Sequence, residues 1–447
     1  MSDALAIDFR WLFRAQSSPF DRAFSAEIGL RLGNSWLTEL EELESRTTRT
    51  HLRACTHTLA LWLAGNWWRL RWEPESRCSR DDVDWRIAHS IGSAGGGFAW
   101  PNILFASDGP SLAVASIPRL RPAAFEPLRY LNGVSGRITA VEFEYKVDGF
   151  VEAVISRLHD LEIDDQTLPQ LWNEVLQERR DPETARWRKL EALCGYDPDE
   201  APPRMIEMLI EDNAGLGAGA LEEVAVHGRH DTPAVLGQLV ELAGSADAPA
   251  PGGVRGILPL LRGRVDYGTD SRPWQRATRL ARFAREEWGL GQRPVSNMEL
   301  GGLIEVNASV FKEGTKSPVP MPAALRTEHP GAYNIYMNSL WATSRRFAVS
   351  RLLGDYLYQQ DEGRLIPATD GKTARQQFQR AFAQEFLCPF GSLREMIGSD
   401  QPKEDQFEEA AAYFDVLPWV VQSTLVNKGE LDREALLWAS EKALMPV

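Results

Sequence analysis

Cysteine is scarce in this sequence, and long apolar runs and an excess of positive charge are missing from it. Its four cysteines, Cys55, Cys78, Cys194 and Cys388, are scattered without a pairing pattern, which indicates a reducing compartment. No segment approaches the roughly 20 consecutive apolar residues of a membrane-spanning helix. Residues 1–5 lack the basic start and the apolar run of a signal peptide. We therefore expect a cytoplasmic protein with no membrane partner.

The charge balance also excludes one class of function. Aspartate and glutamate number 63 against 49 lysines and arginines, so the formal net charge is −14. This disfavours a protein that coats nucleic acid, because phosphate binding depends on clustered Lys and Arg, although one local basic surface stays compatible. The chain of 447 residues is long for a single core and suggests two or three domains.

Hydrophobic patterning predicts an α+β fold class with a mixed N-terminal domain over residues 1–147. Nine of the 15 tryptophans lie within the first 172 residues, where we expect them mainly in a core. Residues 48–72 are predicted to be helical, with Leu59, Leu63, Trp67 and Leu70 on one face. Short apolar or alternating runs predict strands at 9–13, 112–117 and 138–145.

The rest of the chain is predicted to be mainly helical. Residues 148–242 form a helical region, because Phe150, Val151, Val154 and Leu158 follow helical spacing. Residues 243–253, almost entirely Ala, Pro, Gly and Ser, are the clearest linker. A second helical region then covers residues 254–447.

An arginine-rich helix is expected just after the linker, with Asp270 or Ser271 as N-cap and Pro273 in its first turn. Arg276, Arg279, Arg282 and Arg285 recur every three residues and so lie on one broad side, while Arg255, Arg262 and Arg264 come shortly before. A solvated face paired with the protein's own acids is the favoured interpretation. The alternative is an anion-binding surface for nucleic acid or an acidic partner.

Three segments near the C-terminus carry a family resemblance. Residues 345–357 read Arg-Arg-Phe-Ala-Val-Ser-Arg-Leu-Leu-Gly-Asp-Tyr-Leu, residues 382–389 read Phe-Ala-Gln-Glu-Phe-Leu-Cys-Pro, and residues 413–416 read Tyr-Phe-Asp-Val before an apolar stretch. In this order, over roughly residues 325–430, they resemble the motifs of ImmA/IrrE-type zinc peptidases. The resemblance implies a mainly helical, zincin-like domain.

The positions that carry chemistry in that family depart from its pattern. The resemblance places the two histidine ligands on Arg351 and Asp355, the general-base glutamate on Leu352, and the acidic third ligand on Gln376. A catalytic zinc needs three protein ligands and an open position for water. Arg351 is a permanent cation, Leu352 cannot accept a proton, and the last histidine of the chain is His329. Asp355 with Asp361 or Glu362 could bind a hard cation, but solvated acids are the simpler interpretation.

We therefore expect a pseudo-peptidase with no metal and no cofactor, which acts as a non-catalytic binding or sensing protein with a protein partner. By analogy with active relatives, its setting would be bacterial stress regulation or defence against phages and mobile elements. We further expect Arg351, Asp355 and Gln376 to form a polar cluster at the former zinc position. Two alternatives remain: a DNA-binding regulator that uses the arginine-rich helix, and a hydrolase with an unrecognised site around His89 or the pair Cys55 and His57.

Overall fold

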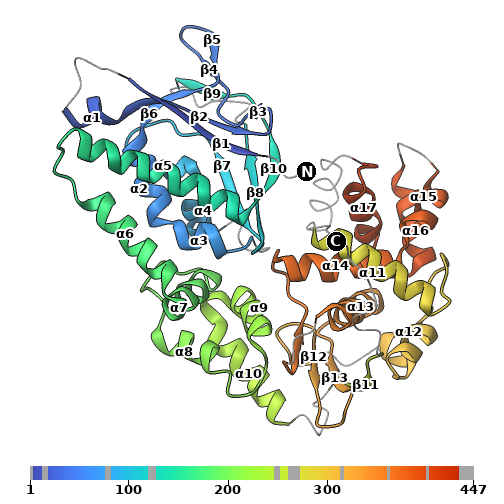
Figure 1. The fold of residues 1–447 in the computed structure, drawn as a ribbon. Coiled ribbons are helices and arrows are strands. Elements are labelled where there is room, and N and C mark those ends of the chain that lie inside the picture. Colours follow the sequence, from blue (N-terminus) through green and yellow to red (C-terminus); the bar gives the residue numbers. More distant parts are fainter. Residues whose placement is uncertain are drawn as a thin grey trace. The chain divides into compact units, whose positions relative to one another are not determined.

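The chain folds into two compact units, which the computed structural model describes over residues 4–12, 19–75, 82–118, 127–245, 252–259, 272–312, 317–359, 363–398 and 402–431 (Figure 1). The first unit is drawn from Met1–Leu209, Ala225–His230 and Gly371–Thr373. The second is drawn from Ile210–Val224, Asp231–Asp370 and Ala374–Val447. Strands and helices are segregated as expected for the α+β class.

The strands of the first unit form three antiparallel sheets. The first sheet has the order β1-β2-β3 with β6 also pairing with β2, the second has the order β10-β8-β7, and the third has the order β5-β4-β9. The strands are β1 (Leu5–Trp11), β2 (Ser25–Leu32), β3 (Ser35–Trp36), β4 (Leu40–Glu42), β5 (Thr47–Arg49), β6 (Leu52–Cys55), β7 (Ile103–Ser107), β8 (Ser111–Ser116), β9 (Leu128–Tyr130) and β10 (Ser135–Thr139).

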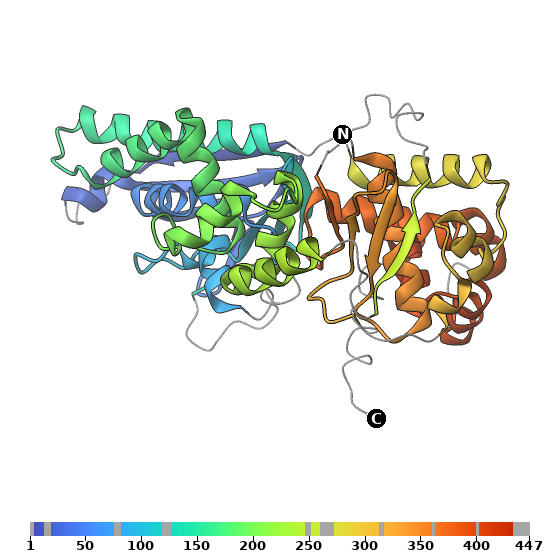
Figure 2. The ribbon, with the colours of Figure 1, turned by 90° about the horizontal axis from the view of Figure 1, so that it is seen from below.

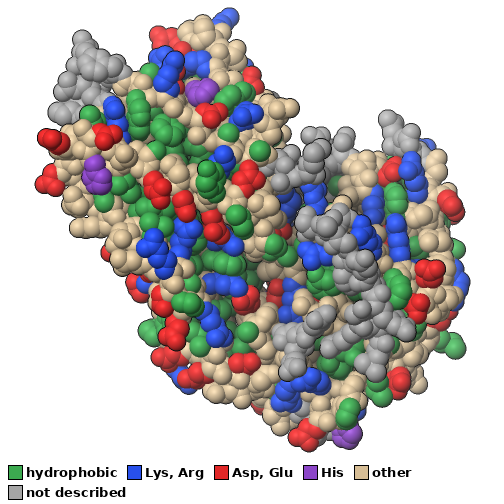
Figure 3. Space-filling model, in the orientation of Figure 1, with side chains coloured by type: hydrophobic (Ala, Val, Ile, Leu, Met, Phe, Trp, Pro, Cys, Tyr) green, Lys and Arg blue, Asp and Glu red, His purple; other side chains and the backbone are tan. Residues whose placement is uncertain are grey.

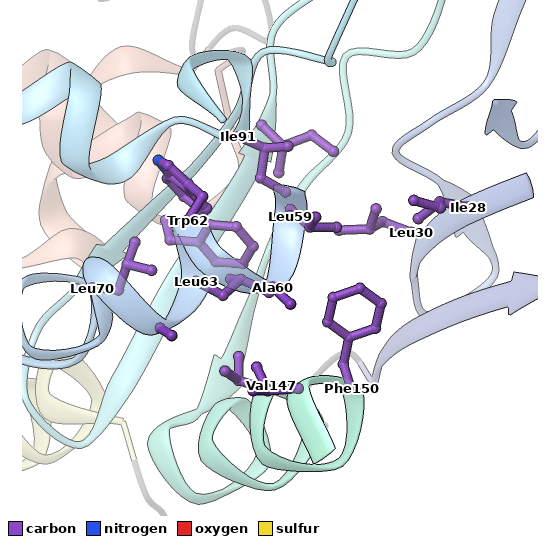
Figure 4. Packing of buried hydrophobic residues seen from close by; sticks show 14 of the residues in the cluster. Ile28, Leu30, Leu59, Ala60, Trp62, Leu63, Leu70, Ile91, Val147 and Phe150 are labelled. Carbon is purple, nitrogen blue, oxygen red and sulfur yellow. The ribbon is translucent and has the colours of Figure 1, made fainter. Parts of the chain in front are cut away.

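Helices pack against the first two of these sheets. Apolar side chains of α2 meet those of α5 and of β2 in a continuous core, with Leu59, Leu63, Val147 and Phe150 at its centre (Figure 4). Both views of the ribbon show α5 running beside β1 (Figures 1 and 2). The helices are α1 (Pro19–Phe24), α2 (Thr56–Gly65), α3 (Trp67–Trp72), α4 (Val83–His89), the 3-10 turn η2 (Ile91–Ser93), α5 (Ala140–Asp160), α6 (Thr167–Arg180), α7 (Pro182–Leu193) and α8 (Pro203–Glu211).

Two predicted elements of this unit are wrong. Residues 138–145 were expected to form one strand, but β10 ends at Thr139 and α5 begins at Ala140. The Thr139 hydroxyl caps the helix by accepting a hydrogen bond from the Glu142 N–H at 3.1 Å. The expected boundary at residue 147 therefore falls inside α5. Residues 48–55, expected to begin the helix at 48–72, belong to β5, β6 and the turn between them instead, and the helix starts only at Thr56.

Other predictions are confirmed. The strands expected at 9–13 and 112–117 correspond to β1 and β8, although Phe13 lies outside the described residues. Leu59, Leu63, Trp67 and Leu70 are all buried, and most of the tryptophans near the N-terminus contribute to the core. None of the described helices combines the length and apolar character that a bilayer-crossing segment requires.

The second unit contains a four-stranded antiparallel sheet of order β11-β13-β12-β14, with helices packed against it. The strands are β11 (Val254–Ile257), β12 (Ala323–Arg326), β13 (Ala332–Tyr336) and β14 (Leu365–Pro367). The helices are α9 (Ala218–Gly228, with 225–228 in the first unit), α10 (Thr232–Gly244), α11 (Pro273–Glu287), α12 (Asn297–Leu303), α13 (Ala342–Tyr358), α14 (Ala374–Leu387), α15 (Phe390–Ile397), α16 (Glu404–Phe414) and α17 (Pro418–Asn427), with 3-10 turns η3 (Arg229–Asp231, divided between the units) and η4 (Ala308–Phe311).

Of the expected linker, residues 246–251 lie outside the described residues, as do the candidate caps Asp270 and Ser271. Pro273 opens α11 as predicted, and Arg272 stands at the N-cap without a side-chain capping bond.

Helices α13 and α14 cross in close contact at Gly354. A Cβ atom added at this glycine would lie 2.9 Å from the Cβ of Phe382 and closer still to its ring. Phe382 is fully buried and its ring stacks on that of Phe386, so it cannot turn away without displacing a neighbour. The absence of a side chain at position 354 therefore sets the distance between the two helices.

We expect Gly354→Ala to lower the free energy of unfolding by about 2 kcal/mol, because inserting a methyl group into a filled core costs about 1–3 kcal/mol. Urea denaturation measures the change. Gly237→Ala in α10 is the control, since a Cβ there meets nothing within 4 Å and should be neutral or stabilising. Equal stability of Gly354→Ala and the wild type would contradict the close approach.

Candidate functional site

The crossing of α13 and α14 brings together the four positions that the family resemblance singles out. Arg351, Leu352 and Asp355 come from α13, and Gln376 comes from the first turn of α14. The Nη2 of Arg351 donates to the Gln376 Oε1 and to the Thr369 carbonyl, each at 2.5 Å. The expected contact between Arg351 and Gln376 is thus present.

Gln376 has partners at both ends of its amide. Its Oε1 also accepts from the Thr369 N–H at 2.9 Å, and its Nε2 donates to the Pro367 carbonyl at 3.2 Å. Gln379, one helical turn later, donates to the same carbonyl at 2.8 Å. Both glutamines are fully buried, so these bonds fix the chain from β14 to α14 against α13.

We expected Asp355 to pair with Arg351. It pairs instead with Arg375. The Arg375 guanidinium donates from Nε to both carboxylate oxygens at 3.1 Å and from Nη2 to Oδ2 at 2.7 Å. The carboxylate of Asp355 is fully buried and Arg375 is 11% exposed. Asp355 lies one turn beyond Arg351 on α13 and faces the start of α14, where Arg375 lies directly before Gln376.

Burial, together with the nearby positive charge of Arg380, lowers the pKa of Arg351 to about 9, although Glu223, Asp355 and Asp370 oppose the shift. Arg351 therefore remains a cation at neutral pH. Leu352 is buried among apolar side chains.

These four positions do not fit a zinc ion. A guanidinium cannot bind a cation, the carboxylate of Asp355 already neutralises Arg375, and the amide oxygen of Gln376 already accepts two hydrogen bonds. Asp361 and Glu362, the other acids considered with Asp355, lie outside the described residues. Within the described ranges, no group of three or more His, Cys, Asp or Glu is arranged to hold a metal ion.

A second buried arginine links the first and third motifs. Arg346 donates to the Val295 carbonyl at 2.6 Å, to the Asp415 carbonyl at 3.2 Å and to the Asn297 side chain. Its Nε also lies 3.2 Å from the Asp415 carboxylate. The start of α13 is therefore tied both to α12 and to the turn between α16 and α17.

The arginine-rich helix, α11, uses its arginines in different ways. Arg279 and Arg282 are exposed, and Arg282 pairs with Glu385 at 2.7 Å. Arg276 donates to the Tyr358 hydroxyl at 2.6 Å. Arg285 is buried, and its guanidinium donates to the carbonyls of Gly291, Phe386 and Arg293, so it does not belong to an anion-binding surface. Arg255 is exposed, whereas Arg262 and Arg264 lie outside the described residues.

The residues considered for a hydrolase are enclosed. Cys55 is 4% exposed and His57 is 5% exposed, and the Nε2 of His57 lies 2.8 Å from the Asp165 carboxylate. His89 has no exposed surface and stacks on Trp85 with ring centroids 4.3 Å apart. The three described side chains therefore offer no nucleophile or base that a substrate could reach.

The chain matches no protein-family model, and no curated protein or solved structure is significantly similar to it.

Two residues of this cluster were not anticipated. Arg375 is the charge partner of Asp355, and the Thr369 backbone both accepts from Arg351 and donates to Gln376. Arg375 could have been found, because a buried carboxylate requires a counter-charge and Arg375 adjoins the third-ligand position. A backbone group such as the Thr369 carbonyl leaves no signal in the residue types.

We expect Asp355→Ala and Arg375→Ala each to cost on the order of 3 kcal/mol, because each removes one member of a buried ion pair. The double variant should cost less than the sum, with a coupling of about 1–3 kcal/mol. A double-mutant cycle followed by urea denaturation measures the coupling. The solvent-accessible pair Arg394 and Glu430, whose side chains are 61% and 26% exposed, is the control, with an expected coupling below about 1 kcal/mol. Strict additivity at Asp355 and Arg375 would rule out the bidentate pair.

The burial of His89 makes the free energy of unfolding depend on pH. Burial holds its pKa below the ordinary value of about 6.5, although the Glu73 carboxylate opposes this shift. The unfolded chain therefore takes up the proton first as the pH falls. The stability linked to His89 is present above pH ~6.5 and is lost as the pH falls toward the lower folded pKa.

Accordingly, His89→Phe should show a smaller loss of unfolding free energy between pH 7.5 and 5.5 than the wild type, measured by denaturation at several pH values. His159→Phe, which removes an exposed histidine of α5, controls for the loss of an imidazole as such. Identical pH profiles for His89→Phe and the wild type would contradict the assignment.

Proposed function

We propose that this chain is a non-catalytic binding or sensing protein, and that residues 325–430 form a degenerate ImmA/IrrE-like peptidase domain. One observation carries the proposal. The positions that the resemblance assigns to the zinc ligands hold Arg351, Asp355 and Gln376, and these side chains are already engaged with the protein's own groups. In the active family a metal ion joins the motif helix to the helix with the third ligand, and here the Arg351–Gln376 hydrogen bond joins the corresponding helices.

The residues at these positions lack the groups that zinc-dependent peptide hydrolysis requires. A water activated by zinc needs a general base beside it, and the base position is the aliphatic Leu352. The guanidinium of Arg351 keeps its proton, so this side chain cannot become a neutral ligand for zinc. These substitutions therefore favour a domain that binds a partner protein without cleaving it.

A protein partner in a bacterial cytoplasm is the setting we propose, in stress regulation or in defence against phages and mobile elements. That setting rests on analogy with the active family alone. The DNA-binding alternative receives less support, because Arg285 is used inside the fold and Arg282 is paired with Glu385. The net charge of −14 also opposes contact with phosphates.

Restoring the family's ligands tests the proposal. The wild-type chain is expected to purify with far less than one zinc per chain. The variant Arg351→His/Leu352→Glu/Asp355→His/Gln376→Glu should instead bind one zinc, because two histidines at i and i+4 and a third acidic ligand would then converge. Competition with a chromogenic chelator measures both affinities.

The control is Gln170→His/Glu174→His, an exposed i and i+4 pair on α6 that supplies only two ligands. A restored variant that binds zinc no more tightly than this control would refute the resemblance. One tightly held zinc in the wild type, lost on Asp355→Ala, would overturn the non-catalytic assignment.

Because the proposed protein binds its partner without cleaving it, a partner that is cross-linked to it in the native host should also be recovered at its full, uncleaved mass.

A further inference from the structure

The first unit has an open sheet edge at β1. Of the described strands, only β2 pairs with it, in an unbroken antiparallel register from Leu5↔Leu32 to Trp11↔Ala26. Backbone bonds from the Gly33 N–H to the Ala4 carbonyl and from the Leu12 N–H to the Ser25 carbonyl, both 2.8 Å, show that even-numbered residues face β2. Because the pattern alternates, the N–H and C=O groups of Ile7 and Phe9 point away from the sheet.

The outward direction is confirmed at one end of the strand. The Leu5 N–H, two residues before Ile7, donates to the Glu142 carboxylate of α5 at 2.6 Å. This bond occupies the start of the edge. Further along, no described residue forms a hydrogen bond with the backbone of Ile7 or Phe9. The edge is therefore able to accept another strand.

A groove of about 580 Å³ runs along this edge between β1 and α5. Its β1 side is formed by residues 6–9, and its α5 side includes Tyr145, Gly149 and Phe150. The rings of Phe150 and Phe9 meet edge-to-face, with their centroids 5.4 Å apart, and this pair gives the groove an apolar floor. Tyr145 is 72% exposed, and Val141, one turn earlier on α5, is 75% exposed. Hydrophobic side chains are visible on this face of the unit (Figure 3).

Gly149 has no internal reason to be glycine. It lies in the middle of the 21-residue helix α5, where glycine is unfavourable, and a Cβ added there would meet nothing within 4 Å. It does, however, line the groove. A side chain at this position would occupy the space next to the β1 edge, so the glycine keeps that space open.

The charges on the groove favour a basic occupant. Asp148 is neutralised by Arg179 at 2.9 Å. Asp8 and Glu152 are exposed and form no ion pair with a described residue, and Lys146 is the one cation of the lining. Asp8 alternates with Phe9 along β1 and so lies on the face of the strand away from α5, whereas Glu152 belongs to α5. A lysine or arginine beside either carboxylate would therefore find complementary charge.

We propose that this groove binds an extended, basic segment of a partner protein, which pairs as an added strand with β1 between Ile7 and Phe9. Main-chain hydrogen bonds supply affinity, the Phe9 and Phe150 floor receives alternate apolar side chains, and Asp8 and Glu152 select basic residues. The site belongs to the first unit and does not depend on the proposed degenerate peptidase domain.

The same charges disfavour other occupants. A second copy of the chain paired through β1 would bring the carboxylates of Asp8 close to one another, in molecules of net charge −14. A nucleic acid would place phosphates against Asp8 and Glu152.

Selection of random 12-residue peptides displayed on phage against the full-length protein tests the proposal. The enriched peptides should alternate apolar and basic residues. A synthetic copy of one such peptide should slow hydrogen exchange in residues 5–11 when it binds. Gly149→Leu should weaken its binding about tenfold or more, yet raise the melting temperature because it removes a glycine from a helix.

Gly237→Leu, at another exposed helical glycine with free space around it, is the matched control and should leave peptide binding unchanged. Asp8→Lys/Glu152→Lys should weaken binding of the basic peptide, most strongly at low salt. The proposal is overturned if no peptide is enriched, or if enriched peptides bind Gly149→Leu as tightly as the wild type. Binding without protection of β1, or a dimer abolished by Gly149→Leu, would also overturn it.

Discussion

The close crossing of α13 and α14 is the constraint on which the second unit depends. Gly354 lets the helix backbones approach, and everything polar at the crossing follows from that distance. Arg351 can reach Gln376, and Asp355 can reach Arg375, only because no side chain separates the helices at this point. β14 joins the same arrangement, since the Pro367 carbonyl accepts from both Gln376 and Gln379. A metal ion would link such helices through one centre, whereas this chain distributes the links over several side chains.

Buried arginines act here as cross-links between elements. A guanidinium presents five N–H donors in a plane, so a single side chain can satisfy carbonyls from several segments. Arg346 joins α12, α13 and the turn after α16, while Arg285 joins α11 to the end of α14. Taking each charge out of water offsets much of the attraction, so these contacts define one packing arrangement more than they add stability.

Helices and strands could be predicted from the sequence where the apolar residues follow a single helical or strand period. The prediction fails where exposed apolar residues add the period of the other element. β1, β8 and the buried face of α2 were recognisable because core residues dominate their pattern. Residues 138–145 resembled a strand because Val141 and Tyr145 are apolar but exposed on a helix. Together with the buried Phe143 they gave a false alternation. These two side chains flank or line the groove beside β1. At the α13–α14 crossing, the contact between Arg351 and Gln376 was predicted correctly from the family resemblance. The spacing of four residues wrongly predicted Arg351 as the partner of Asp355, which is Arg375, because that choice depends on how α14 enters the crossing.

Neither unit is one uninterrupted stretch of chain, and this affects the order of events during synthesis. The first unit takes in residues 225–230 and 371–373 besides its long N-terminal part. On the ribosome, domains normally fold as they emerge, beginning with the N-terminal one. Here the sheets of the first unit can form early, but the unit is complete only after residue 373 has left the exit tunnel, when most of the second unit has already been translated. A nascent chain that stalls before that point exposes an unfinished surface to chaperones and proteases, so translation speed through residues 210–373 is expected to influence the yield of native protein.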